Sequence, residues 1–360
     1  MGGDESILET GGVSQQRMAS YGPLVEQIHI LVFSRKQLPL QQIGNVFIYS
    51  SGGCCRLSSF FKACFLAKKI IINNKIDVIS TQDPFESALI GWWQKKTRHI
   101  KLNIQIHGDF FSNDYWKKQR WFNSIRYKKA VFVLGEADSI RVVSERLKKS
   151  LVDKFKIAPE KIVVAPIYSD FSGLNREMPQ QENGRFTFLI VSRLTKEKNL
   201  PMAFRSFSKL QKGNKEIILK VAGDGPERKS LENLAKKLKI ENSVQFLGWL
   251  NKEKLAAQYG GAHCFLLPSD FEGWGLAALE AAYFGLAIVM TDVGCCGEIL
   301  RPGSDVLSAA PRDEGGFAAA MQEVFSDEAL RASLGRKAKV ALEKLLTKEQ
   351  TMELYKKFWS

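Results

Sequence analysis

Short apolar runs alternate with longer amphipathic segments along nearly the whole chain. The short runs are rich in β-branched and aromatic residues, which favours strands, and the longer segments repeat apolar residues with a helical period. Parallel strands need a crossover connection, which is usually a helix, so this alternation is typical of parallel sheets covered by helices. We therefore predict an α/β fold made of two doubly wound, Rossmann-like domains.

The first half of the chain carries six predicted strands, at residues 28–33, 46–49, 77–81, 102–106, 139–143 and 162–165. The second half carries five, at 186–191, 217–222, 243–247, 264–267 and 287–291. Predicted helices of the second half lie at 200–211, 227–239, 252–259, 276–284, 316–324, 328–346 and 348–359.

The length of 360 residues is about twice that of a usual domain. Residues 172–185 are polar, contain Pro and Gly and lack a period, which is typical of a linker. We predict a first domain over 1–171, a second domain over 186–345 and a terminal helix over 346–360.

Composition excludes several classes of protein. Apolar residues make up 45% and charged residues 25%, so the chain is neither mostly disordered nor collagenous. The chain has no long apolar run and no basic-then-apolar start, and we therefore expect a cytoplasmic protein without a spanning helix or leader. Its six cysteines have no C-x-x-C spacing, which favours reduced thiols over disulfides or a zinc site.

The charge is basic and unevenly distributed. The net charge is +14, and residues 1–170 carry 25 Lys and Arg against 15 Asp and Glu, whereas the rest carry 27 against 23. A basic surface suits nucleic acid, anionic lipid or a phosphorylated substrate, and net charge does not choose among them.

The start of the first domain lacks an expected element. A doubly wound domain usually opens with a buried strand that feeds a glycine loop, but only the polar MGGDESILET precedes Gly11 and Gly12. We predict that the first strand is missing, either lost or left out of the assigned reading frame. An apolar segment encoded in frame directly upstream would support this, and a stop codon there would argue against it.

The segment 269–280, SDFEGWGLAALE, is the strongest candidate site. It follows an apolar strand, leads into a helix and places Glu272 and Glu280 eight residues apart. Gly273 and Gly275 permit a tight turn with bare amides, which bind phosphate or sugar oxygens at a helix start. The alternative is an ordinary glycine turn with a solvated Glu. A second turn of small residues at 291–298 is expected at the same sheet edge.

The loop 192–199, SRLTKEKN, follows the first strand of the second domain. A guanidinium from Arg193 and an ammonium from Lys198 suit a diphosphate, although a solvated charged surface is the alternative. The turn 223–227, GDGPE, is a weak signal, because it lacks the third glycine of a dinucleotide fingerprint.

In order, VSRLTKEKN, VAGDGPE, VQFLGW, SDFEGWGLAALEA and TDVGCCGEIL resemble the successive motifs of the family 4 retaining glycosyltransferases. Segments 137–145 and 159–162 resemble, more loosely, the end of that family's acceptor domain. The resemblance implies the GT-B fold, in which two Rossmann-like domains face each other across a cleft and the final helices cross back onto the first domain. It makes residues 1–171 the acceptor-side domain and residues 186–345 the nucleotide-sugar-binding domain.

The resemblance also implies roles for single residues. Arg193 and Lys198 would hold the donor diphosphate and stabilise the departing nucleoside diphosphate, which is electrostatic work without a metal. Glu272 would position the donor sugar, and Glu280 would accept the ribose hydroxyls. The amides of Gly273, Trp274, Gly275 and Leu276 would contact the sugar and the phosphates, and Gly294 would approach the phosphates. Leu247 and Gly248 would border the nucleobase. Gly11 and Gly12 would form the donor-side glycine loop, and His107, in an HGD loop, would reach across the cleft to the transferred sugar.

The resemblance implies retention of the anomeric configuration, with no metal or other cofactor, and the absence of Asp-x-Asp agrees with this. Two departures from the family pattern are Cys295–Cys296 and the segment 166–168.

Residues 115–133 interleave aromatic and basic side chains in one expected helix. Such a helix suits an anionic bilayer surface, and the alternative is a covering helix with a solvated basic face. The first reading predicts peripheral attachment to the inner membrane face, with a glycan or lipid-linked acceptor in polysaccharide synthesis. Two further alternatives are a catalytically inactive sugar-nucleotide-binding relative and a basic nucleic-acid binder, and no nucleic-acid motif supports the second.

Overall fold

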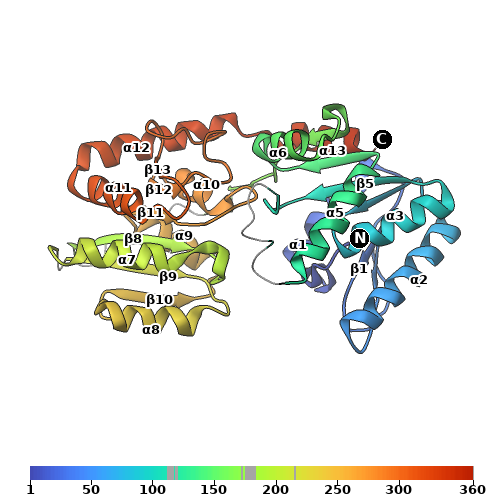
Figure 1. The fold of residues 1–360 in the computed structure, drawn as a ribbon, viewed down its shortest axis with the longest axis horizontal. Coiled ribbons are helices and arrows are strands. Elements are labelled where there is room, and N and C mark those ends of the chain that lie inside the picture. Colours follow the sequence, from blue (N-terminus) through green and yellow to red (C-terminus); the bar gives the residue numbers. More distant parts are fainter. Residues whose placement is uncertain (112–116, 118–120, 172, 175–183, 215, 360) are drawn as a thin grey trace. The chain divides into compact units, whose positions relative to one another are not determined.

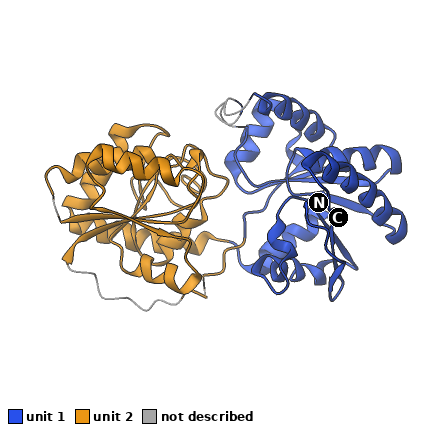
Figure 2. Cartoon of the chain, turned by 90° about the horizontal axis from the view of Figure 1, so that it is seen from below, with its two compact units in different colours: residues 1–167, 346–360 blue, residues 168–345 orange. Residues whose placement is uncertain are grey.

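The computed structural model describes residues 1–111, 117, 121–171, 173–174, 184–214 and 216–359 (Figure 1). It divides the chain into two compact units (Figure 2). Unit 1 comprises residues 1–167 and 346–360, and unit 2 comprises residues 168–345. Most of the expected linker, at 172 and 175–183, lies outside the described residues.

Unit 2 is built on one six-stranded parallel sheet covered by helices (Figure 1). In sheet order its strands are β10 (Val244–Gly248), β9 (Ile217–Ala222), β8 (Phe186–Val191), β11 (Cys264–Leu267), β12 (Ala287–Thr291) and β13 (Leu307–Ala309). The helices are α7 (Leu200–Gln211), α8 (Arg228–Leu238), α9 (Lys252–Gly260), α10 (Leu276–Tyr283), α11 (Glu314–Ser326) and α12 (Glu328–Ala341). Strands β9, β11 and β12 are buried along their whole length, as expected when helices cover both faces of a parallel sheet.

The order of the strands fixes where a ligand of unit 2 would bind. The chain runs from β8 outward through β9 to β10 and then returns to β11 on the other side of β8. The loops that follow β8 and β11 therefore diverge at the carboxyl edge of the sheet. Crevices at such switch points are where open α/β sheets bind ligands.

Unit 1 contains two separate sheets. The first has the order β1 (Ile28–Val32), β3 (Val46–Ser50), β2 (Gln41–Ile43), with β2 antiparallel to β3. The second is parallel, in the order β4 (Val78–Thr81), β5 (Lys101–Ile106), β6 (Ser139–Val142), β7 (Ile162–Val164). The described helices are α1 (Val13–Ala19), α2 (Arg56–Asn74), α3 (Glu86–Arg98), α5 (Asn123–Gly135), α6 (Glu145–Phe155) and α13 (Lys348–Trp359).

The C-terminal helix α13 belongs to unit 1. Its Tyr355 and Phe358 are buried, and the Arg141 guanidinium of β6 lies over the Tyr355 ring, 4.5 Å from its centroid. The side-chain amide of Asn103 on β5 donates a hydrogen bond to the backbone carbonyl of Phe358.

All eleven predicted strands are present, with ends that differ by one residue at most. The sequence missed β2 and β13, which are three residues long and too short to show a period. The expectation of one helix over 115–133 is wrong in its described part, since Trp121 and Phe122 form a turn and α5 begins at Asn123. The buried stripe that fixes α5 in place begins only at Asn123; residues 112–116 and 118–120 lie outside the described residues.

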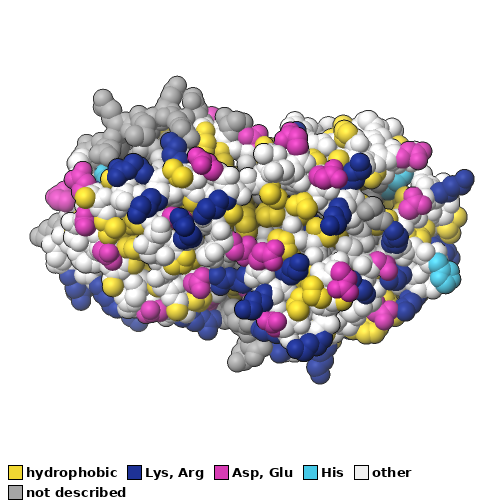
Figure 3. Space-filling model, turned by 90° about the horizontal axis from the view of Figure 1, so that it is seen from above, with side chains coloured by type: hydrophobic (Ala, Val, Ile, Leu, Met, Phe, Trp, Pro, Cys, Tyr) yellow, Lys and Arg dark blue, Asp and Glu magenta, His cyan; other side chains and the backbone are white. Residues whose placement is uncertain are grey.

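None of the helices in the described part of the chain combines the length and the apolar character needed to cross a bilayer. On the face drawn in Figure 3, Lys and Arg side chains are interspersed with Asp and Glu and do not gather into one basic patch.

Candidate active site

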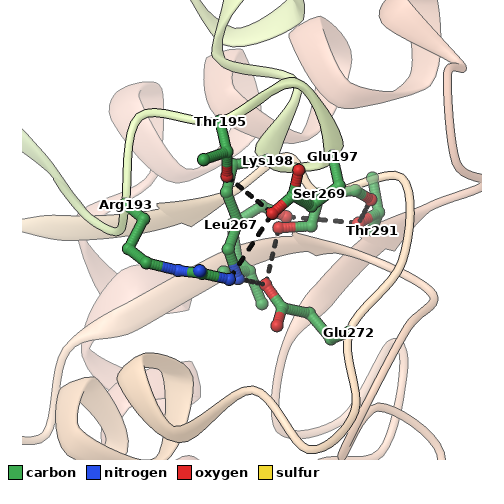
Figure 4. A network of polar contacts seen from close by, with 8 residues as sticks. All are labelled: Arg193, Thr195, Glu197, Lys198, Leu267, Ser269, Glu272 and Thr291. Carbon is green, nitrogen blue, oxygen red and sulfur yellow. Dashed lines mark hydrogen bonds and ion pairs between the residues drawn. The ribbon is translucent and has the colours of Figure 1, made fainter. Parts of the chain in front are cut away.

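A largely shielded ion pair joins the two loops that diverge at the switch point of unit 2. Lys198 Nζ lies 2.6 Å from Glu272 Oε1, and the side chains are only 16% and 10% exposed. Ser269 Oγ donates to the same oxygen at 2.7 Å (Figure 4). Thr291 Oγ1, from the end of β12, donates to the carbonyl oxygen of Ser269 at 2.6 Å and so fixes the turn. The structure thus brings together Lys198 and Glu272, which are 74 residues apart in the sequence.

Arg193 lies in the same loop as Lys198, with 70% of its side chain exposed. Its Nη2 is 3.5 Å from Glu197 Oε1, and Thr195 Oγ1 donates to that same oxygen at 2.6 Å (Figure 4). Exposed ion pairs contribute little stability, so the pair with Glu197 serves to orient the guanidinium and leaves it accessible.

Asp270 locks the two loops together and was missed by the sequence analysis. Its backbone amide donates to the carbonyl oxygen of Glu197 at 2.8 Å. The nearly buried carboxylate accepts from Asn199 Nδ2 at 2.9 Å and from Arg312 Nη2 at 3.0 Å. Asp270 lies three residues before Gly273 of the glycine turn, but its partners are distant in sequence, so no local pattern indicated this role.

The glycine turn 273–275 lies against the loop that follows β12. Gly275 directly precedes α10 and has a φ of 83°, a backbone conformation that favours glycine. Gly294 has a φ of 60°, and a Cβ there would lie 2.7 Å from the carbonyl oxygen of Trp274 and 3.0 Å from Cβ of Glu272. Gly294 therefore permits the two loops to approach. Trp274 is buried, so the turn can offer its backbone but not the face of its ring.

Glu280 lies one helical turn inside α10 and is paired with a tyrosine of α9. Tyr259 Oη donates to Glu280 Oε2 at 2.7 Å, with the Ala277 carbonyl oxygen 3.3 Å away. Burial raises the pKa of Glu280 above its ordinary value, and the hydrogen bond from Tyr259 acts in the opposite direction. Tyr259 and Glu280 are 21 residues apart, which is why sequence periodicity could not find the tyrosine.

The other predicted donor-side residues of unit 2 lie at the end of β10. Gly248 has a φ of 68°, and its carbonyl oxygen accepts from the amide of Gly223 at 2.7 Å. A Cβ on Gly223 would lie 1.9 Å from the carbonyl oxygen of Ser192. The GDG turn, a weak motif in the sequence, thus brings the loops after β8, β9 and β10 together, and Leu247 is half-buried beside Gly248.

The remaining predicted site residues belong to unit 1. His107 follows β5, and its Nε2 lies 3.0 Å from Gln82 Oε1. Burial, reinforced by the charges of Arg141 and Arg17, lowers the pKa of His107 to about 3, so the ring is neutral at pH 7. The amide of Gly11 (φ 76°) donates to Gln15 Oε1 at 2.8 Å, and Gly12 directly precedes α1.

All six cysteines are free thiols, and Cys295 and Cys296 are fully buried behind the glycine turn. Across the described ranges, no three His, Cys, Asp or Glu side chains are grouped so that they could hold a metal ion.

Two family models match the chain. The model described as "Glycosyl transferases group 1" matches residues 174–341, and the model described as "Glycosyltransferase Family 4" matches residues 26–167. Among curated relatives, the glycogen synthase of Mycobacterium tuberculosis is 29% identical over 59% of this chain and 51% of its own length. The alpha-monoglucosyldiacylglycerol synthase of Streptococcus pneumoniae is 27% identical over 64% of this chain and 54% of its own. The chain spans about half the length of these relatives.

Solved structures share the fold. Sucrose-phosphate synthase from Thermosynechococcus elongatus superposes with a TM-score of 0.79 at 18% identity, covering 97% of this chain and 94% of the other. The Anabaena protein HepE, in complex with UDP and glucose, superposes with a TM-score of 0.75 at 16% identity, covering 97% and 96%.

Proposed function

Because this chain belongs to the family 4 glycosyltransferases, which have the GT-B fold, we propose that it transfers a sugar from a nucleoside-diphosphate sugar to an acceptor hydroxyl. The observation that carries the proposal is the meeting of Lys198, Glu272 and the accessible Arg193 at the switch point of unit 2. A similar solved structure supports it, since HepE is in complex with UDP and glucose.

In the proposed mechanism, Lys198 and Arg193 bind the diphosphate and stabilise the charge that grows on it as the bond to the sugar breaks. The Lys198 side chain is only slightly exposed, and its attraction to the diphosphate would be stronger for that reason, because electrostatic interactions are stronger where water is excluded. Two cations at the diphosphate would supply the positive charge that a divalent ion supplies in other enzymes, so we propose transfer without a metal. Activity that persists in excess EDTA supports this, and activity lost in EDTA and restored by Mg²⁺ contradicts it.

We assign Glu272 to donor positioning and not to nucleophilic attack. Its Oε1 already accepts from Lys198 and Ser269, and both hydrogen bonds stabilise the negative charge and so lower its nucleophilicity. A retaining reaction in which the acceptor enters on the face that the diphosphate leaves needs no enzyme nucleophile. The anomeric configuration of the product, measured by NMR, tests this step: an inverted product would contradict it.

Glu280 would accept the ribose hydroxyls. Tyr259 occupies its Oε2, which leaves Oε1 for the ribose. The neutral ring of His107 would contact the transferred sugar, and Gly11 and Gly12 would lie on the donor side.

The test is binding followed by transfer. A nucleoside diphosphate at 100 times its dissociation constant adds about 2.7 kcal/mol to stability, which differential scanning detects. Arg193→Ala and Glu280→Ala should abolish the stabilisation and the transfer. Lys209→Ala, an exposed cation of α7 paired with Glu314, is the matched control and should change neither. Binding without transfer from any UDP- or GDP-sugar would favour the inactive relative instead.

We further propose that unit 1 attaches to an anionic bilayer. The acceptor would then be a glycan or a lipid-linked molecule. The structure adds a feature that the sequence analysis missed: Leu57, Phe61 and Phe65 of α2 recur at every fourth residue and are strongly exposed. Such spacing puts them on one face, and the exposed Lys62, Lys68 and Lys69 share the helix. An exposed apolar row with basic neighbours suits a lipid surface.

Co-sedimentation with liposomes tests the attachment. Phe61→Ser with Phe65→Ser should release the protein from vesicles that contain phosphatidylglycerol. Val340→Ser, which removes an exposed apolar side chain of unit 2, is the control. Sedimentation that is independent of anionic lipid would remove the proposal.

A further inference from the structure

Two of the six cysteines, Cys54 and Cys55, are adjacent in the sequence and exposed to solvent. They lie in the loop between β3 and α2, and Cys55 directly precedes the helix. The other four cysteines are buried: Cys64, Cys264, Cys295 and Cys296. Buried thiols pack as small apolar side chains, a role that burial does not give to the exposed pair.

The sulfur of Cys55 accepts hydrogen bonds from the start of α2. The Ser58 amide donates to it, and the Ser58 hydroxyl and the Leu57 amide are further donors. These hydrogen bonds, with that of the Ser58 amide first, hold the pKa of the Cys55 thiol below its ordinary value. A helix N-terminus stabilises a thiolate in this way, and the thiolate is the nucleophilic form of cysteine. Cys55 therefore combines exposure with a stabilised thiolate.

The Cys54 side chain lies beside this sulfur. Its thiol is within hydrogen-bonding distance of the Cys55 sulfur, and its Sγ lies 3.4 Å from Ser58 Oγ. The start of α2 thus presents a nucleophilic sulfur together with a second exposed thiol. Exposed cysteines of low pKa that have such a neighbour are the ones that peroxides oxidise reversibly.

A disulfide between adjacent residues is strained. Consecutive Cα atoms are about 3.8 Å apart, whereas the Cα atoms of disulfide-bonded cysteines are usually about 4.4–6.8 Å apart. Strained disulfides are reduced more easily than structural ones and are therefore labile. A bond between Cys54 and Cys55 would thus be opened again by ordinary thiol reductants.

We propose that Cys54 and Cys55 form a reversible oxidation site whose oxidant is a hydroperoxide. The Cys55 thiolate attacks the peroxide, so that an S–O bond forms, the O–O bond breaks, and the other oxygen leaves and takes a proton from water. The Cys54 thiol then attacks the sulfur of the resulting sulfenic acid, so that the S–S bond forms and the S–O oxygen leaves as water. Two electrons pass from the two sulfurs to the peroxide, and two equivalents of a small thiol reverse the change.

The oxidation also alters the start of α2. A disulfide sulfur carries no negative charge and accepts hydrogen bonds weakly, so the Leu57 and Ser58 amides lose their acceptor. Loss of a helix cap frays the first turn, and hydrogen exchange of these two amides should become several-fold faster. The proposal depends neither on sugar transfer nor on membrane attachment.

Treatment of the full chain with hydrogen peroxide tests the site. The tryptic peptide 37–56 contains both cysteines and none of the other four. It should become lighter by two hydrogen atoms and return to its first mass in dithiothreitol. The matched control is the pair Cys295–Cys296, which is also adjacent but fully buried and should stay reduced under the same treatment.

Two variants separate the roles of the thiols. In Cys54→Ser the sulfenic acid has no resolving thiol, and dimedone should label Cys55. In Cys55→Ser peroxide should produce neither a label nor a disulfide in this peptide, and the helix keeps its start because serine is a favoured N-cap. In the untreated protein, iodoacetamide should alkylate Cys55 about tenfold faster than Cys54 at pH 7.

Four results would overturn the proposal. They are equal alkylation rates of Cys54 and Cys55, an unchanged mass of peptide 37–56 after peroxide, oxidation of Cys295–Cys296 at the same rate, and a disulfide that links two chains in place of the two neighbours.

Discussion

Replacing Tyr259 by phenylalanine removes a single hydroxyl whose distance to Glu280 Oε2 is 2.7 Å. A hydrogen bond to a charged group contributes about 1.5–3 kcal/mol. We take the lower end, because Tyr259 contacts the carboxylate and not the ribose, so only part of the energy of this hydrogen bond reaches the ligand. A loss of about 1.4 kcal/mol is a tenfold loss of affinity.

The variant should therefore bind a nucleoside diphosphate about tenfold more weakly by calorimetry. The matched ligand is the 2′,3′-dideoxy form, which offers Glu280 no hydroxyl. Wild type and variant should bind that form alike, because the effect of Tyr259 passes through the carboxylate to the ribose.

The pH dependence has a definite sign. The Glu280 carboxylate accepts ribose hydroxyls only when ionised, and burial raises its pKa while the Tyr259 hydroxyl lowers it. Affinity should thus fall as the pH drops through the pKa of Glu280, and in the variant it should fall at a higher pH. Equal weakening of both ligands, or an unchanged pH midpoint, would refute the assignment of Tyr259 and Glu280 to the ribose.

Three other results are expected. Gly294→Ala should lower the free energy of unfolding by about 2–3 kcal/mol in denaturant titrations, because the residue has a φ of 60° and the added Cβ would lie 2.7 Å from a backbone oxygen. Gly303→Ala is the control: its φ is 72°, but the added Cβ would meet no atom within 4 Å, so the free energy of unfolding should fall by only about 1 kcal/mol. Lys198→Gln should reduce the transfer rate at least about 100-fold, and a loss below tenfold would contradict leaving-group stabilisation. The His107 ring should show no NMR titration between pH 5 and 8. The free energy of unfolding should fall as the pH drops from 6.5 to about 3, because in this range the imidazole is protonated in the unfolded chain but not in the folded one.

The parts of the fold that the sequence predicted are those with long, strongly apolar strands. β8, β9, β11 and β12 have the predicted bounds, because burial on both faces demands an unbroken apolar run. β2 and β13 have only three residues each, which is too short to show a period; β2 pairs with β3, which follows it after a tight turn, and β13 pairs with β12.

The same distinction holds in the candidate site. Lys198 and Glu272 each follow a strand, and the carboxyl ends of parallel strands share an edge, so their meeting could be anticipated from the order of elements. Tyr259 and Asp270 act through partners on other elements, and Gly223 acts through its missing side chain. No local pattern encodes such partnerships, and they appear only once the chain has folded.

The pairing of Lys198 with Glu272 has a consequence for how the site works before any substrate arrives. Removing two charges from water costs about as much as their attraction returns, so such a pair adds little net stability. It does hold the ammonium in place, with Ser269 fixing the carboxylate in turn. Under the proposed function, a diphosphate that approaches would meet a cation already positioned, and it would gain attraction without ordering a flexible side chain. Arg193 is more exposed and more loosely paired, and can adjust to the ligand. One rigid and one adaptable cation suit a group that must be gripped during transfer and released afterwards.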